Sequence, residues 1–230
     1  MTATIPDHRD ICISCAEMAG DKELNLLWDL LGESIGLSYL LHDGPNFVVI
    51  PGAGAIVPGY TLVIPRPHIL SMGFLDPSLD EEFTHLLAGV TAWAEAEFGR
   101  EAHIFEHGAK NFREKGGACA DHAHTQVVPL GPTDRFVAQL RSDFTTTAST
   151  SYLHSARTTV ELGNGDPYLY THSASHGGAV AVATGAKSQY FRRLMAAHDE
   201  RPDEWDGPIF PGTDNMRRTL AAGQNLHRYL

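Results

Sequence analysis

The thirteen residues ACADHAHTQVVPL, from Ala118 to Leu130, place two histidines and a glutamine at alternate positions just ahead of an apolar run. A β-strand repeats every two residues, so alternate side chains point to the same face. The segment therefore predicts a strand with His122, His124 and Gln126 on one face, and with small or apolar residues packed against a helix on the other. A face of this composition is either a solvated polar surface or a functional site.

The segments that precede this strand predict an antiparallel sheet with one long helix packed on it. Two extended segments flank the turn 43–46, and further strands are expected at 59–65 and 102–108, where β-branched and aromatic residues are frequent. Between these last two, an apolar stripe at helical spacing predicts a helix that Asp76 can cap and Gly99 ends. The order contains no repeated βαβ unit, which favours an α+β fold.

The last hundred residues predict an extension packed on the same sheet. Helices are expected at 133–144, 187–200 and 213–230, a polar loop at 145–151, and a hairpin of two strands, 167–173 and 178–184. We therefore divide the chain into a catalytic core, residues 1–130, and a C-terminal α/β extension, residues 131–230.

Composition excludes several classes of partner. The formal net charge of −11 argues against binding to nucleic acids or anionic membranes, which require a basic face. No apolar run reaches the ~18 residues that cross a bilayer, and the N-terminus lacks the pattern of a secretory signal. Three cysteines in a chain without an export signal indicate a reducing compartment, so we expect a cytoplasmic protein.

Two short motifs lie outside the histidine-containing strand. Cys12 and Cys15 have the spacing of zinc ligands, although two structural thiols are an alternative and a redox pair is less well supported. The loop AKNFREKGGACAD, residues 109–121, carries cations and glycine N–H groups that suit an anion. Within it we expect Asn111, Gly117 and Cys119 to contact a substrate.

Taken together, GYTLVIPRPHI, FEHG, the glycine loop and DHAHTQVVP resemble the histidine-triad (HIT) superfamily over residues 11–130. Gln126 stands where the superfamily's common pattern has a third histidine. This variant is similar to the branch that contains galactose-1-phosphate uridylyltransferase and the dinucleoside tetraphosphate phosphorylases. The resemblance implies a HIT-like antiparallel sheet, a nucleotide or nucleotide-sugar substrate, and a homodimer formed through a sheet edge.

The resemblance also implies roles for individual residues. His124 would attack the α-phosphorus and form a nucleotidyl-histidine. Gln126 would bind phosphate oxygens without carrying a proton, which fits transfer to phosphate or a phosphorylated metabolite better than hydrolysis. A structural zinc would be held by the four residues Cys12, Cys15, His68 and His122.

Further residues are assigned on weaker grounds. Glu106, beside His107 at the end of its strand, is a candidate for proton transfer. Lys187 and Tyr190 are candidate phosphate contacts near the start of a helix. The superfamily's hydrolases carry a ribose-binding carboxylate where this chain reads IPGAGAI. This absence keeps a non-catalytic nucleotide-binding protein open, beside a HIT-type hydrolase and a metal-dependent hydrolase that uses His122 and His124.

Overall fold

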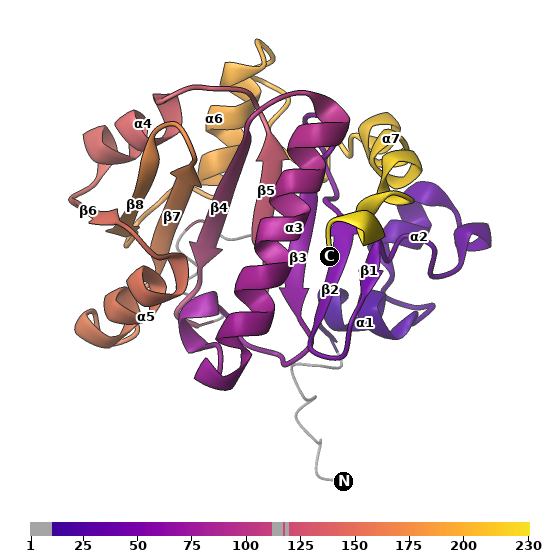
Figure 1. Cartoon of the computed structure of the whole chain (residues 1–230), viewed down its shortest axis with the longest axis horizontal. Helices are drawn as coiled ribbons and strands as arrows, with labels where there is room; N and C mark the ends of the chain where they lie inside the picture. Colours follow the sequence, from indigo (N-terminus) through magenta and orange to yellow (C-terminus); the bar gives the residue numbers. More distant parts are fainter. Residues whose placement is uncertain (1–10, 112–116, 118–119) are drawn as a thin grey trace, which may run out of the picture.

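An eight-stranded antiparallel sheet forms the centre of the protein (Figure 1). The computed structural model describes residues 11–111, 117 and 120–230. Hydrogen-bonded neighbours follow the order β1-β2-β3-β5-β4-β7-β8-β6. The strands are β1 (His42–Asp43), β2 (Phe47–Pro51), β3 (Thr61–Pro65), β4 (Ala102–Gly108), β5 (Thr125–Pro129), β6 (Thr146–Ser149), β7 (Tyr168–Ser173) and β8 (Gly177–Val182). The predicted α+β class is confirmed.

Helices cover both faces of this sheet and enclose two hydrophobic cores (Figure 1). The helices are α1 (Ile13–Ala19), α2 (Leu26–Leu31), α3 (Asp80–Phe98), α4 (Arg135–Asp143), α5 (Tyr152–Leu162), α6 (Tyr190–His198) and α7 (Thr213–Gly223). One core lies between the sheet and α3 and α5, and contains Trp93 and Phe83. The other lies between the opposite face and α2, α4, α6 and α7, and contains Phe136 and Phe191. No helix in the described part of the chain has the length and apolar character needed to cross a membrane.

The predicted long helix is confirmed, with a different start. Asp76 caps a short 3-10 helix, Pro77–Leu79, by accepting a hydrogen bond from the Ser78 backbone N–H, and α3 follows at Asp80. Gly99 ends α3 with a positive φ of 65°, a conformation that glycine adopts without strain.

Two expectations from the sequence were wrong in their boundaries. The strand that carries Gln126 begins only at Thr125, so His122 and His124 lie in an irregular segment before it. The alternation nevertheless holds, because Ala123 and Val127 belong to the core beneath α3. The polar stretch 145–151, expected to be a loop, contains the edge strand β6. Only β8 pairs with β6, so its polar side chains remain partly solvated.

Strands from both parts of the chain form the one sheet. β7 pairs with β4 over six positions, from His103 opposite Ser173 to Gly108 opposite Tyr168. The extension therefore continues the sheet outward from β4, and the helix α6 that follows β8 returns to the face that carries Phe105 (Figure 1). The division at residue 130 stays a prediction.

Candidate active site

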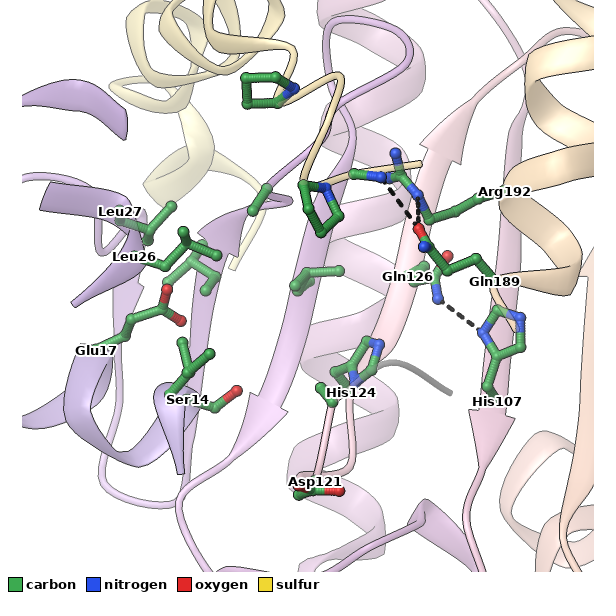
Figure 2. A pocket seen from close by; sticks show the side chains of 18 of the residues that line it. Ser14, Glu17, Leu26, Leu27, His107, Asp121, His124, Gln126, Gln189 and Arg192 are labelled. Carbon is green, nitrogen blue, oxygen red and sulfur yellow. Dashed lines mark hydrogen bonds between the residues drawn. The ribbon is translucent and has the colours of Figure 1, made fainter. Parts of the chain in front are cut away.

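A cavity of about 490 Å³ lies on the sheet face that α2, α6 and α7 cover. Its wall is mostly apolar, and Leu26, Leu27 and Ile50 are among its lining residues. Its polar lining includes His107 and Gln126 from the sheet, His124 from the segment before β5, and Gln189 and Arg192 from the region of α6 (Figure 2). An apolar cavity with few convergent polar groups is the usual form of a small-molecule site.

His124 presents one ring nitrogen to this cavity and uses the other to hold its position. Its Nδ1 lies 2.9 Å from the backbone carbonyl oxygen of His122, which can only accept. Nδ1 therefore carries the proton in the neutral ring, and Nε2 carries the lone pair. Burial lowers the pKa of His124, against the effect of this hydrogen bond. The ring extends into the cavity with its unprotonated nitrogen available (Figure 2).

A chain of hydrogen bonds fixes Gln126 beside it. The Gln126 side-chain amide spans Tyr60 Oη, at 2.7 Å, and His107 Nδ1, at 3.2 Å. On its other side, His107 Nε2 accepts a hydrogen bond of 3.2 Å from the backbone N–H of Phe191, at the start of α6. Burial is the main cause that lowers the pKa of His107 to about 3, so this ring is neutral.

These donors and acceptors determine the orientation of the amide. Because the Phe191 N–H can only donate, His107 Nε2 holds the lone pair and Nδ1 holds the proton. The Nδ1–H group needs an acceptor, which places the Gln126 carbonyl oxygen at His107 and its NH₂ group at Tyr60 Oη. Figure 2 draws the amide nitrogen toward His107, and this assignment interchanges it with the amide oxygen, which has nearly the same shape. In this orientation the NH₂ group keeps one N–H beyond its bond to Tyr60 Oη.

A second cluster joins the N-terminal helix to the segment before β5. Cys12 Sγ and Cys15 Sγ each lie 3.5 Å from His122 Nδ1, and Cys15 Sγ lies 3.3 Å from His68 Nδ1. The four ligand atoms all lie within 4.8 Å of one another. The structure therefore brings together the four residues that the sequence interpretation assigned to a metal.

The dimensions of this cluster fit a tetrahedral ion. Bonds of about 2.3 Å to sulfur and about 2.0–2.1 Å to nitrogen give sulfur–nitrogen edges of about 3.5 Å in a tetrahedron. His122 Nε2 lies 2.7 Å from the carbonyl oxygen of Pro65, so Nε2 carries the proton and Nδ1 is free to ligate. Burial is the main cause that lowers the pKa of His122 to about 4, which keeps the ring neutral as a ligand must be.

Glu106 lies on the opposite face of the sheet from this cavity. Its carboxylate accepts hydrogen bonds from the Met72 backbone N–H and from the hydroxyls of Tyr152 and Tyr168, at 2.5–2.7 Å. Neighbours on a strand face opposite ways, so His107 takes the position toward the cavity and Glu106 the position toward α5. Burial raises the pKa of Glu106 to about 7. Its contacts join strands and helices, and we assign it no part in the chemistry.

Of the predicted substrate contacts that the structure describes, one lines the cavity and the others do not. Gly117 lines the cavity, whereas the partly buried Asn111 does not. Cys119 lies outside the described residues. Lys187 is exposed on a turn, and Tyr190 packs its ring on Phe144 and donates its hydroxyl proton to Asp143, so neither lines the cavity.

Three residues that line the cavity were not chosen as contacts from the sequence. Gln189 and Arg192 occupy the positions toward the site that we expected of Lys187 and Tyr190. Glu17, on α1, is buried in the apolar wall near Leu26 and Leu27 (Figure 2), and burial raises its pKa to about 8. It supplies a carboxyl group from an element where no motif indicated one.

Comparison with known proteins gives a distant similarity of structure. No known family profile matches the chain, and no curated protein is significantly similar to it. A hypothetical histidine triad nucleotide-binding protein from Sulfolobus tokodaii has 21% sequence identity and a TM-score of 0.35, over 42% of this chain and 62% of that protein. A Hit-like protein involved in cell-cycle regulation from Bartonella henselae has 14% identity and a TM-score of 0.40, over 56% of this chain and 90% of that one. This chain thus spans less than two thirds of the Sulfolobus protein.

Proposed function

We propose that this protein is a nucleotidyltransferase or phosphorylase that cleaves a nucleoside di- or polyphosphate bond through a covalent intermediate on His124. The observation that carries the proposal is the surroundings of the two ring nitrogens of His124. The carbonyl of His122 holds Nδ1–H at 2.9 Å, and Nε2 faces a cavity large enough for a nucleotide. A neutral imidazole fixed in this tautomer is a nucleophile that needs no base.

The reaction proceeds in two balanced steps. His124 Nε2 attacks phosphorus, a nitrogen–phosphorus bond forms, and the bond to the leaving oxygen breaks with its electron pair. An acceptor oxygen then attacks the same phosphorus, the nitrogen–phosphorus bond breaks, and the lone pair returns to Nε2. Transfer of this kind depends mainly on positioning and on charge stabilisation, and the proposed role of the Gln126 NH₂ group is to donate to a phosphate oxygen.

The acceptor is proposed to be phosphate or a phosphorylated metabolite, with water as the alternative of a HIT-type hydrolase. Gln126 has no proton that it can give to a leaving group or take from water at neutral pH. The neighbouring His107 is buried and neutral, with both ring nitrogens engaged. Of the two described side chains that bond the Gln126 amide, Tyr60 and His107, neither is suited to take a proton from water at neutral pH.

We further propose that the Cys12, Cys15, His68 and His122 cluster holds a structural zinc. Its two thiolates and two imidazoles form a closed set, whereas catalytic zinc sites keep a position open. The ion would fix His122, and the carbonyl of His122 orients His124. The metal-dependent hydrolase is less well supported, because His124 engages Nδ1 with a backbone carbonyl and belongs to no ligand cluster in the described residues.

A labelling experiment tests this function. Purified protein is incubated with nucleoside diphosphates, dinucleoside polyphosphates and nucleotide-sugars that carry label at the α-phosphorus, and is quenched in alkali. We expect a protein adduct that is stable to base and labile to acid, absent in His124→Ala. His85→Ala, which removes an exposed histidine of α3, is the matched control and keeps the label. Adduct in His124→Ala, or none with any of these substrates, would refute the proposal.

The same labelled protein distinguishes transfer from hydrolysis. The adduct is isolated and divided among buffer, inorganic phosphate and hexose 1-phosphates. A transferase releases the nucleotide at least ten times faster with one of the phosphate acceptors than in buffer alone. Equal release in all three identifies a hydrolase. We expect the enzyme to be a homodimer, which light scattering measures on the same preparation.

A further inference from the structure

Arg192 is a buried cation in the wall of the cavity, with most of its donors unused. Its side chain is 4% exposed. Nε donates to Gln189 Oε1, at 2.9 Å, and to the carbonyl of Trp205, at 3.0 Å. Neither terminal nitrogen forms a hydrogen bond with any residue that the structure describes, and Nη2 is buried completely.

The charge of this guanidinium is also unpaired. Within residues 11–111, 117 and 120–230, no carboxylate forms an ion pair with Arg192. Burial of an unpaired charge is costly, and proteins pair almost all buried arginines. The two terminal nitrogens form a planar fork that matches the oxygens of a phosphate or carboxylate. A ligand that brings such a group into the cavity would supply the missing partner.

The surrounding backbone keeps space for this fork. Gly54 has a φ of +75°, and a Cβ at this position would lie 2.6 Å from Arg192 Nη2. Gly207 lies beside Gly54, since the same Cβ would lie 2.8 Å from the Gly207 Cα, and the Gly207 backbone N–H donates to Gln189 Oε1 at 3.2 Å. Because Gln189 Oε1 accepts from both Arg192 and Gly207, the NH₂ end of this amide remains as a further donor.

Two contacts through Tyr60 place the Arg192 guanidinium near Gln126, the side chain proposed to bind the phosphate that His124 attacks. Arg192 Cζ lies 5.9 Å from the centroid of the Tyr60 ring, and Tyr60 Oη lies 2.7 Å from the Gln126 amide. In Figure 2, Arg192 and Gln189 reach into the cavity above Gln126, and His124 lies below it. Along this wall the cavity therefore presents a nucleophile, then Gln126, then a cation.

We propose that Arg192 and Gln189 form a second anion subsite, which binds the phosphate adjacent to the one that His124 attacks. That phosphate belongs to the leaving group in the first step and to a phosphorylated acceptor in the second. The inference rests on the proposed function. It specifies a substrate with at least two linked phosphates, since a nucleoside monophosphate leaves Arg192 without an anion.

Binding to an inactive protein tests this subsite. In a His124→Asn background, which forms no adduct, calorimetry measures the dissociation constants of ADP, GDP and UDP, of the matching monophosphates, and of inorganic pyrophosphate. We expect at least one diphosphate to bind about 10- to 100-fold more tightly than its monophosphate, the range for hydrogen bonds to a charged partner. Arg192→Met removes this difference and the binding of pyrophosphate.

Two further variants separate binding from folding. Arg193→Met removes the neighbouring cation of α6 and leaves the preference for diphosphates unchanged. Arg192→Lys keeps the charge without the fork and retains part of the preference. Because Met replaces an unpaired buried charge, the melting temperature of Arg192→Met without ligand should equal or exceed that of its parent.

The outcomes distinguish this proposal from the one on which it rests. Loss of pyrophosphate binding in Arg192→Met supports the subsite even if His124 never becomes labelled. If His124 is labelled but Arg192→Met binds diphosphates and pyrophosphate as its parent does, the subsite is refuted and the function stands. If Arg192→Met has a lower melting temperature and unchanged affinities, Arg192 is a structural residue and the proposal fails. The proposal also fails if pyrophosphate does not bind the His124→Asn parent.

Discussion

The backbone N–H of Phe191 donates to His107 Nε2 at 3.2 Å, and this bond sets the direction of the Gln126 amide. The first turn of α6, in the C-terminal part of the chain, thereby determines which end of a side chain on β5 faces the cavity. His107 is a positioning residue in this arrangement. Gln126 is the group that would touch the substrate.

Replacement of His107 by Phe should impair transfer through Gln126. Phe keeps the ring contact with Phe191 but leaves the Gln126 amide free to turn. We expect kcat/KM to fall roughly 10- to 100-fold, the effect of about 1.4–3 kcal/mol, the cost of an unsatisfied buried group. Steady-state kinetics with the substrate found by labelling measure this change.

His103→Phe is the matched control for this variant. His103 lies on the same face of β4, is equally buried and bonds a backbone carbonyl, but does not line the cavity. We expect it to lower the free energy of unfolding and to leave kcat/KM within twofold. Equal kinetic losses in both variants would show that His107 acts only through stability.

Removal of one thiolate should release the metal and loosen the segment that carries His124. Wild-type protein should contain one zinc per chain by mass spectrometry, and Cys12→Ser should contain none. We expect Tm to fall by about 10 °C, which corresponds to roughly 3–4 kcal/mol in a chain of this size. A chelator should lower the wild-type Tm similarly, and Cys119→Ser, outside the ligand set, should retain the zinc. Purified protein without metal, or with an unchanged Tm in chelator, contradicts the assignment.

Glu106 should make stability fall as pH rises toward neutrality. Burial raises the pKa of Glu106 in the folded protein to about 7, above the 4.5 of an exposed glutamate. Between these values the folded state holds a proton that the unfolded state has released, so the free energy of unfolding decreases with pH. The contribution is complete below pH 4.5 and is lost above pH 7, a total of about 3 kcal/mol.

Glu106→Gln removes this dependence, because an amide does not titrate. Urea unfolding at pH 5 and pH 7.5 should show the wild type losing about 2 kcal/mol relative to the variant over this interval, because part of the contribution is already lost at pH 5. Glu161→Gln, at an exposed position of α5, should follow the wild type at both values. Parallel curves for wild type and Glu106→Gln would exclude the raised pKa.

Two neighbouring glycines that contact Arg192 should respond differently to alanine. A Cβ at Gly54 would lie 2.6 Å from Arg192 Nη2 and 2.8 Å from the Gly207 Cα, and Gly54 has a positive φ. Gly54→Ala should therefore weaken pyrophosphate binding and lower the free energy of unfolding by about 1–3 kcal/mol. A Cβ at Gly207 would lie 3.5 Å from the Arg192 guanidinium, an ordinary contact. Gly207→Ala should therefore change both quantities little, and equal losses would be inconsistent with a space kept for the guanidinium. Calorimetry and urea unfolding measure both.

The sequence predicted much of the fold because its signals were local. The alternation around Gln126, the helical stripe from Leu79 to Phe98 and the hairpin near His176 each depend on neighbours in the chain, and all three elements formed. Helix α5 was missed because its polar and apolar residues gave no clear stripe, and the core beneath it comes from distant strands. Strand β6 was missed because an edge strand needs few apolar residues.

The candidate site likewise contains some residues that the sequence predicted and others that it did not. The metal cluster was predicted because Cys12 and Cys15 have the spacing of zinc ligands, and because the resemblance to the HIT superfamily implied His68 and His122 as the other two ligands. The positions of Glu106 and Arg192 depend on which face of a strand and of a helix meets the cavity. An error of one residue reverses the face on a strand and turns it by about 100° on a helix. Glu17 carried no local signal, since its neighbours in space are set by the packing of α1 against α2.

The pairing of β4 with β7 decides how the cavity assembles. His124 and Arg192 come from parts of the chain that are far apart in sequence, yet one polypeptide contributes both. The pocket therefore forms by folding within one chain, a step whose rate does not depend on protein concentration. Dilution should therefore leave His124 and Arg192 together in one pocket.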